Sequence, residues 1–185
     1  MLTAAMDYSI GPCIDTHGQH YGLLRHVLGL KPRGTALEFG VGKGESLRLI
    51  AAHMPVIGFD TFQGLPHDWR PGYPAGSFAQ PHPPAVDNAD LVIGLFEDTL
   101  AGADFTDLEI GLVHLDADLY SSTATALRAV GPHLHTGCFV VFDEWHGYAG
   151  AENDEQRAWR EFVDRTNIAW SVVGHSFQQW AIRLA

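Results

Sequence analysis

The sequence predicts an α/β fold: a mostly parallel sheet with helices on both faces and an antiparallel hairpin of strands at the C-terminal end. Short apolar runs alternate with amphipathic stretches along the chain, which is typical of strands connected by helices. The last two apolar runs follow each other without a helix between them, so we expect them to pair antiparallel at an edge of the sheet.

The elements can be assigned in chain order. A first helix is expected over 16–29, where apolar residues recur at helical spacing. Short apolar runs predict strands at 35–40, 56–60, 90–94, 110–116 and 137–145, and then at 168–174 and 177–185 for the hairpin. Helices are expected between them at 44–54, 98–105, 121–134 and 152–166. The last of these helices begins with acidic residues, which the helix dipole favours.

One segment, 62–88, fits neither strand nor helix. It is rich in proline, glycine and aromatic residues, and loops of this length in compact domains are usually functional or disordered. Its aromatic residues Trp69, Tyr73 and Phe78 favour packing over disorder.

Composition excludes several classes of function. Acidic residues outnumber lysine and arginine by 22 to 11, and a net charge of −11 repels nucleic acid and anionic membranes. The chain shows no signal peptide and no apolar run long enough to span a membrane. Cys13 and Cys138 form no disulfide framework, so we expect both to be reduced core thiols of a cytoplasmic protein.

The ends of the first two predicted strands indicate a ligand site, because open parallel sheets bind ligands at the carboxyl ends of their strands. Gly40, Gly42 and Gly44 form a G-x-G-x-G turn into a helix, and such a turn lets the backbone approach an anionic group. Asp60 ends the second strand and can accept hydrogen bonds from ribose hydroxyls. A dinucleotide or S-adenosyl-L-methionine fits so far, but the dinucleotide spacing G-x-G-x-x-G is missing.

Five segments carry a family resemblance: "LEFGVGKGESL", "VIGFDTFQGLPHDW", "GLFEDTL", "HLDADLYSST" and "FVVFDEW". In this order and spacing they resemble the motifs of class I S-adenosylmethionine-dependent methyltransferases, most closely the macrocin O-methyltransferase-like branch. The resemblance covers residues 35–165 and implies a seven-stranded Rossmann-like sheet with a reversed last strand. We therefore expect an N-terminal helical segment, 1–34, and a methyltransferase region, 35–185, within a single domain.

The resemblance also implies roles for single residues. The methionine end of the cofactor would be held by Glu38, Gly40, Gly42 and Ser46, the ribose by Asp60, and the adenine by Phe96 and Glu97. Ser46 can equally cap its helix, and Asp98 is expected to cap the helix that follows it.

Three acids are expected to converge beside the cofactor. Asp116 ends the fourth strand and the pair Asp143 and Glu144 ends the fifth, and these strands are central neighbours in a doubly wound sheet. Clustered carboxylates repel unless a cation joins them, and all-oxygen ligation suits Mg²⁺ or Ca²⁺. In the resembled branch a metal is held by the first acid of D-x-D and by two adjacent acids 27 residues later, as here, although Glu144 replaces the usual Asp. Without metal, Asp116 and Asp143 would bond backbone amides and line the pocket.

Other polar residues of this region invite several interpretations. Asp118 points away from Asp116 along an extended chain, so we expect it to cap the next helix. His114 is expected to be a buried histidine with a hydrogen-bond partner. His146, just after the acid pair, is either a general base or a loop histidine.

The sequence thus predicts an O-methyltransferase for a small-molecule hydroxyl, assisted by Mg²⁺, with Asp116 or His146 taking the proton. The acceptor pocket is expected between 62–88 and 145–152, with Trp69, Tyr73, Trp145 and Tyr148 in its walls. The chain looks shorter than typical relatives, so we expect a partner subunit of a homo-oligomer to supply a lid. A metal-independent methyltransferase and a non-catalytic binding module remain as alternatives, whereas an NAD-dependent oxidoreductase conflicts with the glycine spacing.

Overall fold

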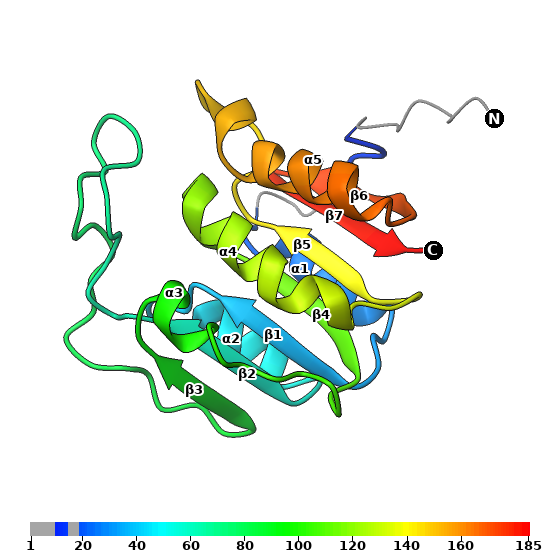
Figure 1. Ribbon diagram of the computed structural model, residues 1–185, viewed down its shortest axis with the longest axis horizontal. Coiled ribbons are helices and arrows are strands. Elements are labelled where there is room, and N and C mark those ends of the chain that lie inside the picture. The colour runs from blue at the N-terminus through cyan, green and yellow to red at the C-terminus, as the bar shows by residue number, and fades with distance from the viewer. Residues whose placement is uncertain (1–9, 15–18) are drawn as a thin grey trace.

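A seven-stranded sheet forms the centre of the computed structural model, which describes residues 10–14 and 19–185 (Figure 1). The strand order is β3-β2-β1-β4-β5-β7-β6. The strands are β1 (Thr35–Phe39), β2 (Val56–Asp60), β3 (Ala89–Ile93), β4 (Ile110–Leu115), β5 (Phe139–Phe142), β6 (Trp170–Ser176) and β7 (Gln179–Leu184). The first five pair in parallel, whereas β7 runs antiparallel between β5 and β6. The predicted fold class, including the antiparallel C-terminal strands, is confirmed.

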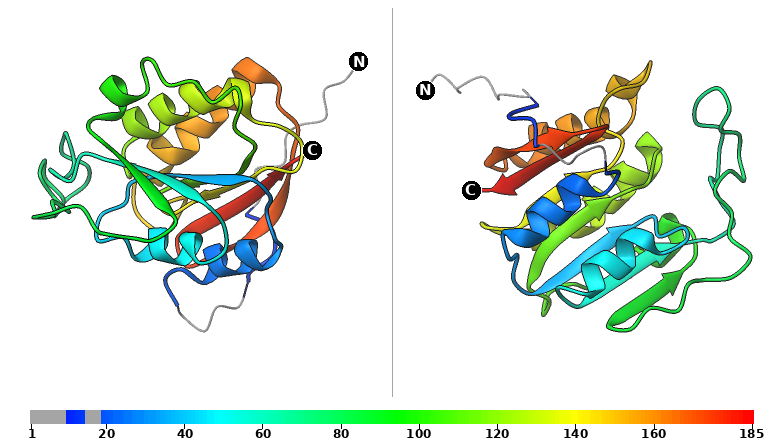
Figure 2. Two further views of the ribbon diagram at one scale, coloured as in Figure 1. Left: turned by 90° about the horizontal axis from the view of Figure 1, so that it is seen from below. Right: turned by 180° about the vertical axis from the view of Figure 1, so that it is seen from behind.

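Helices cover both faces of this sheet (Figure 2). One face carries α1 (Gly22–Gly29) and α2 (Glu45–Ala51). The other carries α3 (Phe96–Thr99), α4 (Tyr120–Val130) and α5 (Glu155–Thr166), with single 3₁₀ turns at Gly131–His133 and Ala151–Asn153. No helix of the described residues is long and apolar enough to cross a membrane.

Two helix predictions need correction. Part of the first predicted helix, 16–18, lies outside the described residues, and α1 begins only at Gly22. The helix expected over 98–105 is α3, which begins at Phe96 after its N-cap residue Leu95. Asp98 therefore lies inside the helix, and its interpretation as a cap was wrong.

The sheet separates two apolar layers. On the α4 and α5 side, Phe142 and Trp159 belong to a fully buried cluster that spans β1, β4, β5 and both helices. Trp145 joins this cluster and stacks on Trp180 at a centroid distance of 4.1 Å. It is 2 % exposed, so its predicted place in the wall of the acceptor pocket was wrong. A second cluster on the other face includes Leu23, and all six residues of β4 are buried between the two layers.

The segment after β2 is an ordered excursion from the sheet, drawn as the long teal loop at the left of Figure 1. Its two arms bond each other: Leu65 N–H donates to Ser77 O at 2.9 Å, and Gln80 N–H donates to Phe62 O at 3.0 Å. Nearer the tip, Trp69 N–H donates to Tyr73 O at 3.0 Å. These hydrogen bonds agree with the expectation that the segment is packed and not disordered.

The two cysteines should differ sharply in reactivity. Cys138 is fully buried, and burial raises the pKa of its thiol to about 12. Cys13 is exposed, so the expectation that both thiols lie in the core was wrong for Cys13. Because the thiolate is the reactive form, a thiol reagent at pH 8 should modify one cysteine of the folded protein quickly and the other only on unfolding. Cys13→Ser should remove the fast phase, and two equally fast thiols in the native wild-type protein would contradict this burial.

Candidate functional site

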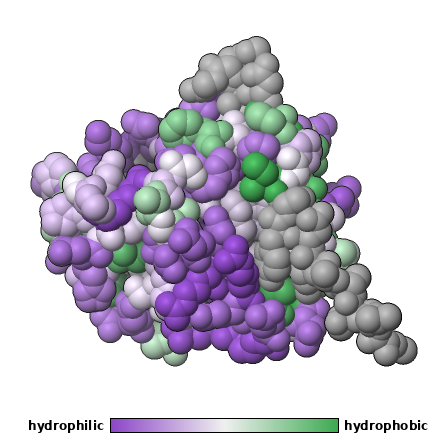
Figure 3. Space-filling view, turned by 90° about the horizontal axis from the view of Figure 1, so that it is seen from above, coloured by the Kyte–Doolittle hydropathy of each residue, from purple (hydrophilic) through white to green (hydrophobic). Residues whose placement is uncertain are grey.

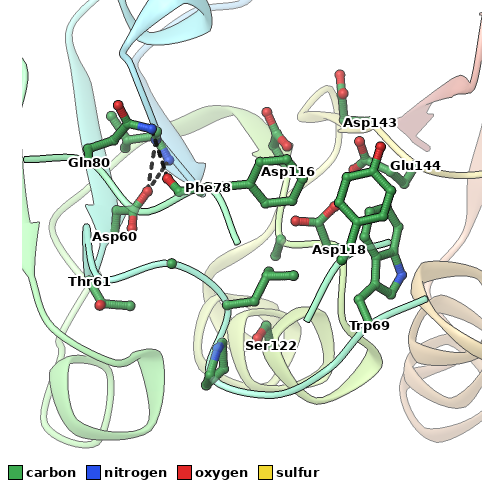
Figure 4. Close-up of a pocket in the computed structure, with 18 of the residues that line it drawn as sticks. Asp60, Thr61, Trp69, Phe78, Gln80, Asp116, Asp118, Ser122, Asp143 and Glu144 are labelled. Atoms are coloured by element: carbon green, nitrogen blue, oxygen red, sulfur yellow. Dashed lines mark hydrogen bonds between the residues drawn. The ribbon is translucent and has the colours of Figure 1, made fainter. Parts of the chain in front are cut away.

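A cavity of about 430 Å³ opens at the carboxyl ends of β1, β2, β4 and β5 (Figure 4). Of the predicted site residues, it is lined by Gly40, Gly42, Asp60, Phe96, Glu97, Asp116, Asp143 and Glu144. These residues come from separate strands and loops, and the strand order brings them together. Glu38, Ser46 and His146 are not part of the lining.

The glycine turn after β1 requires glycine at its first position. Gly40 has φ +93°, and a Cβ there would lie 1.7 Å from the backbone oxygen of Asp116. On the same edge, Asp116 N–H donates to Phe39 O at 2.9 Å, so β4 and the turn are in direct contact. The missing side chain therefore lets the turn pass next to the residue that ends β4.

Asp60 holds this turn from the neighbouring strand. One of its carboxylate oxygens, Oδ2, accepts the N–H groups of Val41 and Gly42, both at 2.8 Å (Figure 4). The other, Oδ1, accepts the N–H of Phe62 at 2.7 Å. The same carboxylate thus fixes the glycine turn and the start of the long loop while it lines the cavity.

Glu38 lies in the core next to His114. The two residues are register partners in β1 and β4, and His114 Nδ1 is 2.9 Å from Glu38 Oε1. Both are 0 % exposed, and Glu38 Oε2 has no hydrogen-bond partner. The structure thus places Glu38 in a buried pair, not in the cavity wall from which we expected it to reach the ligand. His114 is buried and partnered as expected.

His114 also reaches the acids of the cavity. Its Nε2 is 3.7 Å from Asp143 Oδ1. Burial alone lowers the pKa of His114, but the interactions with Asp143 and Glu38 outweigh it, so this pKa lies well above its usual value. Burial would raise the pKa of Asp143, yet His114 and His20 lower it below its usual range. The buried imidazole is therefore a positive partner for two carboxylates.

The predicted acid cluster is brought together only in part. Among the described residues, His114, Asp116 and Asp143 each offer an atom within 4.8 Å of the others, a spacing that could hold a metal ion. Glu144 lines the cavity but lies outside this group. Burial, and then the charge of Asp143, raise the pKa of both Asp116 and Glu144 well above the usual values.

Asp118 does not cap α4. It has φ +58°, and α4 begins at Tyr120 after Leu119, with no side-chain cap. The left-handed backbone turns the Asp118 side chain into the cavity, beside Asp116 (Figure 4). Burial, and then Asp143, raise the pKa of Asp118 to about 7, against an opposing effect of Arg70. The capping prediction was wrong because alternation along an extended strand ends where the chain leaves β4.

His146 and Ser46 lie apart from the cavity. His146 N–H donates to Gln178 O at 3.1 Å, and its ring packs edge-on against His175 at 5.6 Å. Burial, followed by the charge of His175, lowers the pKa of His146. Ser46 is 2 % exposed in the first turn of α2. This arrangement matches the loop-histidine alternative for His146.

Sequence reasoning missed two cavity residues with strong local contacts. Arg70 stacks on aromatic rings of the long loop, and His20, from before α1, has its Nε2 3.3 Å from Asp143 Oδ2. The aromatic content of 62–88 indicated the wall that contains Trp69 and Tyr73. No pattern around Arg70 or His20 indicated that the fold would bring them to the acids.

Comparison with known proteins finds similarity to O-methyltransferases. A family model described as macrocin O-methyltransferase matches residues 85–174, which contain the strand-end acids. The calicheamicin methyltransferase CalS11 superposes with a TM-score of 0.68 at 25 % identity, covering 89 % of this chain and 76 % of its own. The family model covers slightly less than half of the chain, and both the matched residues and the fold of the whole chain are similar to O-methyltransferases. The O-methyltransferase NovP shares the fold at 21 % identity, with a TM-score of 0.68. The superposition covers 87 % of this chain and 77 % of NovP.

A curated relative matches a shorter stretch. The 8-demethyl-8-(2,3-dimethoxy-alpha-L-rhamnosyl)-tetracenomycin-C 4'-O-methyltransferase of Streptomyces olivaceus is 41 % identical over 59 residues. The match covers 32 % of this chain and 22 % of the relative.

The glycine turn offers a matched pair of variants. Gly40→Ala should lower the free energy of unfolding by more than ~2 kcal/mol, because a left-handed alanine adds its own strain to the clash with Asp116 O. Gly42→Ala should cost only ~1–2 kcal/mol, since φ is +50° but no atom lies within 4 Å of the added Cβ. Urea unfolding measures both, and equal losses would contradict the close contact at Gly40.

Proposed function

We propose that this chain is an S-adenosyl-L-methionine-dependent O-methyltransferase acting on a hydroxyl of a small molecule. One observation carries the proposal: a single cavity joins the glycine turn and Asp60 to the acids that follow β4 and β5. The first group suits a nucleoside with an amino acid end, and the second suits a hydroxyl that must lose a proton. The cofactor and the acceptor hydroxyl would thus bind next to each other in one cavity.

In the cofactor half, the turn from Gly40 to Gly42 would contact the methionine end, and Phe96 and Glu97 would flank the adenine. Asp60 already accepts three backbone N–H groups. A carboxylate offers about four acceptor positions, so Asp60 has room for one ribose hydroxyl rather than two unless the turn moves. We expect Glu38 to act on this half only through the strand it stabilises.

In the acceptor half, methyl transfer is an in-line displacement. The acceptor oxygen forms a bond to the methyl carbon, the carbon–sulfur bond breaks with its electron pair going to sulfur, and the hydroxyl proton passes to a carboxylate. Asp118 is the proposed proton acceptor, since it lines the cavity and no side chain of the described residues donates a hydrogen bond to it. Asp116 would orient the hydroxyl. Holding oxygen and carbon in line about 3 Å apart supplies most of the rate enhancement.

The names of relatives favour a sugar hydroxyl as the acceptor. The curated relative is named for a rhamnosyl-tetracenomycin, and CalS11 is described as a TDP-rhamnose 3'-O-methyltransferase, again at 25 % identity. In this chain, Trp69, Tyr73 and Phe78 line the acceptor side of the cavity and offer ring faces against which a sugar can pack. A glycosidic acceptor is therefore the first class to test.

A divalent cation fits part of the acid cluster. Asp116 and Asp143 offer oxygens, and a cation would favour the charged form of Asp116, whose pKa burial and the charge of Asp143 raise. The nearest third donor is His114 rather than Glu144, so the set is not the all-oxygen one that we predicted. A metal here would lower the pKa of an acceptor hydroxyl. A metal-independent transferase stays the alternative, because His114 already compensates part of the charge.

Cofactor binding is tested first. S-adenosylhomocysteine should raise the melting temperature, and at a hundred times its dissociation constant it should add about 2.7 kcal/mol to the free energy of unfolding. Asp60→Ala should weaken binding by ~1–3 kcal/mol, because it removes both the ribose contact and the bonds that order the turn. Absence of any melting shift at millimolar cofactor would refute the proposed function and would favour a different ligand.

The roles of the acids can be separated by paired variants. With methyl-labelled cofactor and an acceptor found in a metabolite extract, Asp118→Asn should lower turnover by ~10²–10⁴-fold while S-adenosylhomocysteine affinity stays unchanged. Asp116→Asn should lower turnover too, and a chelator should reproduce its effect only if a metal takes part. Full turnover by Asp118→Asn would rule out this residue as the proton acceptor, and turnover after exhaustive chelation would rule out the metal.

A further inference from the structure

Arg70 is held in a cage of aromatic rings on the wall of the cavity. Its guanidinium carbon lies 4.0 Å from the ring centroid of Trp69, 4.3 Å from that of Tyr148 and 4.9 Å from that of Tyr73. Such stacking occupies the faces of the planar guanidinium and leaves its N–H groups directed outward along its edges. The orientation of these donors is therefore fixed before any ligand arrives.

These donors lack protein partners. Arg70 Nε is buried without a hydrogen bond, and no carboxylate in the described part of the chain lies within ion-pair distance of the guanidinium. A buried unpaired donor is rare in native proteins and usually indicates an absent ligand or water. Arg70 acts through space on Asp118, whose pKa it lowers against the larger effects of burial and Asp143.

Arg70 also has an unusual position in the charge pattern of the cavity. Of the other basic residues that line the cavity, His20 contacts Asp143 and Lys43 is exposed in the glycine turn at the cofactor end. Arg70 stands on the loop wall instead, next to Tyr73 and near Asp118. Among the described residues, Arg70 is thus the permanent cation of the acceptor half, and no ion pair within that part of the chain compensates its charge.

The rings that hold Arg70 are themselves tied together. Asp154 Oδ2 accepts the Trp69 Nε1–H at 3.0 Å and the Tyr148 hydroxyl at 3.1 Å. On the loop side, Tyr73 N–H donates to Arg70 O at 2.8 Å. These bonds join the long loop after β2 to the segment after β5 and keep the cage closed around the guanidinium.

We propose that Arg70 binds an oxyanion, a carboxylate or a phosphate, on the acceptor molecule. The planar fork of a guanidinium matches two oxygens of such a group, and the negative charge compensates the cation, which a neutral hydroxyl would not do. This inference rests on the proposed function, because it specifies that the acceptor of the methyl group is an anionic molecule. Arg70 is then a specificity-determining residue that sets which hydroxyl of the acceptor reaches Asp118.

The test measures binding rather than turnover. Protein saturated with S-adenosylhomocysteine is titrated with inorganic phosphate, with glucuronate and with neutral glucose, and binding is measured by calorimetry. We expect saturable millimolar binding of phosphate or glucuronate and weaker binding of glucose. Arg70→Gln should weaken anion binding roughly tenfold or more, and Arg70→Lys should fall between the two. The stronger of the two anions identifies the group as a phosphate or a carboxylate.

Arg157→Gln is the matched control. Arg157 also stacks on an aromatic ring, with its guanidinium carbon 4.0 Å from the Tyr120 centroid, but it lies outside the cavity and pairs with Glu161 at 2.9 Å. This variant should bind the anions like the wild type. Equal anion affinity in wild type and Arg70→Gln, affinity for both anions no greater than that for glucose, or no saturable anion binding would each overturn the proposal. If S-adenosylhomocysteine itself fails to bind, the anions are titrated into free protein, so the two proposals fail separately.

Discussion

The concentration of carboxylates at one end of a buried sheet is the constraint on which the rest of the structure depends. Glu38, Asp116, Asp143 and Glu144 lie on or just after β1, β4 and β5, and burial opposes the charge of each. The structure compensates part of this charge with His114, which contacts Glu38 on one side and Asp143 on the other. Removing that imidazole would leave the buried Glu38 without its side-chain partner, which is far more costly than losing one surface contact.

The geometry of the cavity follows from the same strand ends. β1 and β4 approach so closely that only glycine fits at position 40, and Asp60 on the next strand holds the turn by its backbone amides. A cation is the ligand that best relieves the remaining negative charge. The methyl donor carries a positive charge on its sulfonium. Binding of the cofactor would therefore also compensate the negative charge of the buried acids. Arg70, fixed by its rings, adds a cation on the acceptor side.

Sequence patterns were sufficient where one local rule decides the structure. Buried parallel strands appear as short apolar runs, and their order brings Asp116 next to Asp143 although 27 residues separate them. The glycine turn and Asp60 were readable for the same reason. Asp118 was not, since its left-handed backbone is set by the turn out of β4 and breaks the alternation of side chains.

Other parts of the site depend on contacts that no local pattern shows. Glu38 was assigned to the cavity, but pairing with β4 puts it opposite His114. Trp145 follows the acid pair and turns into the core against Trp180, while His146 turns toward β6. The cage around Arg70 unites two loops that are 75 residues or more apart, through ring contacts with Tyr148 and through hydrogen bonds to Asp154.

The central claim is that the sulfonium of the cofactor lies beside the buried acids. Calorimetric titration of chelator-treated protein near pH 7, in buffers of different ionisation enthalpy, counts the protons released on binding. Asp118 has a pKa of about 7 and that of Asp116 is raised, so the cluster retains protons that a nearby positive charge should expel. The account predicts that S-adenosylmethionine releases more protons than the uncharged thioether S-adenosylhomocysteine. Equal proton release by the two ligands would contradict it.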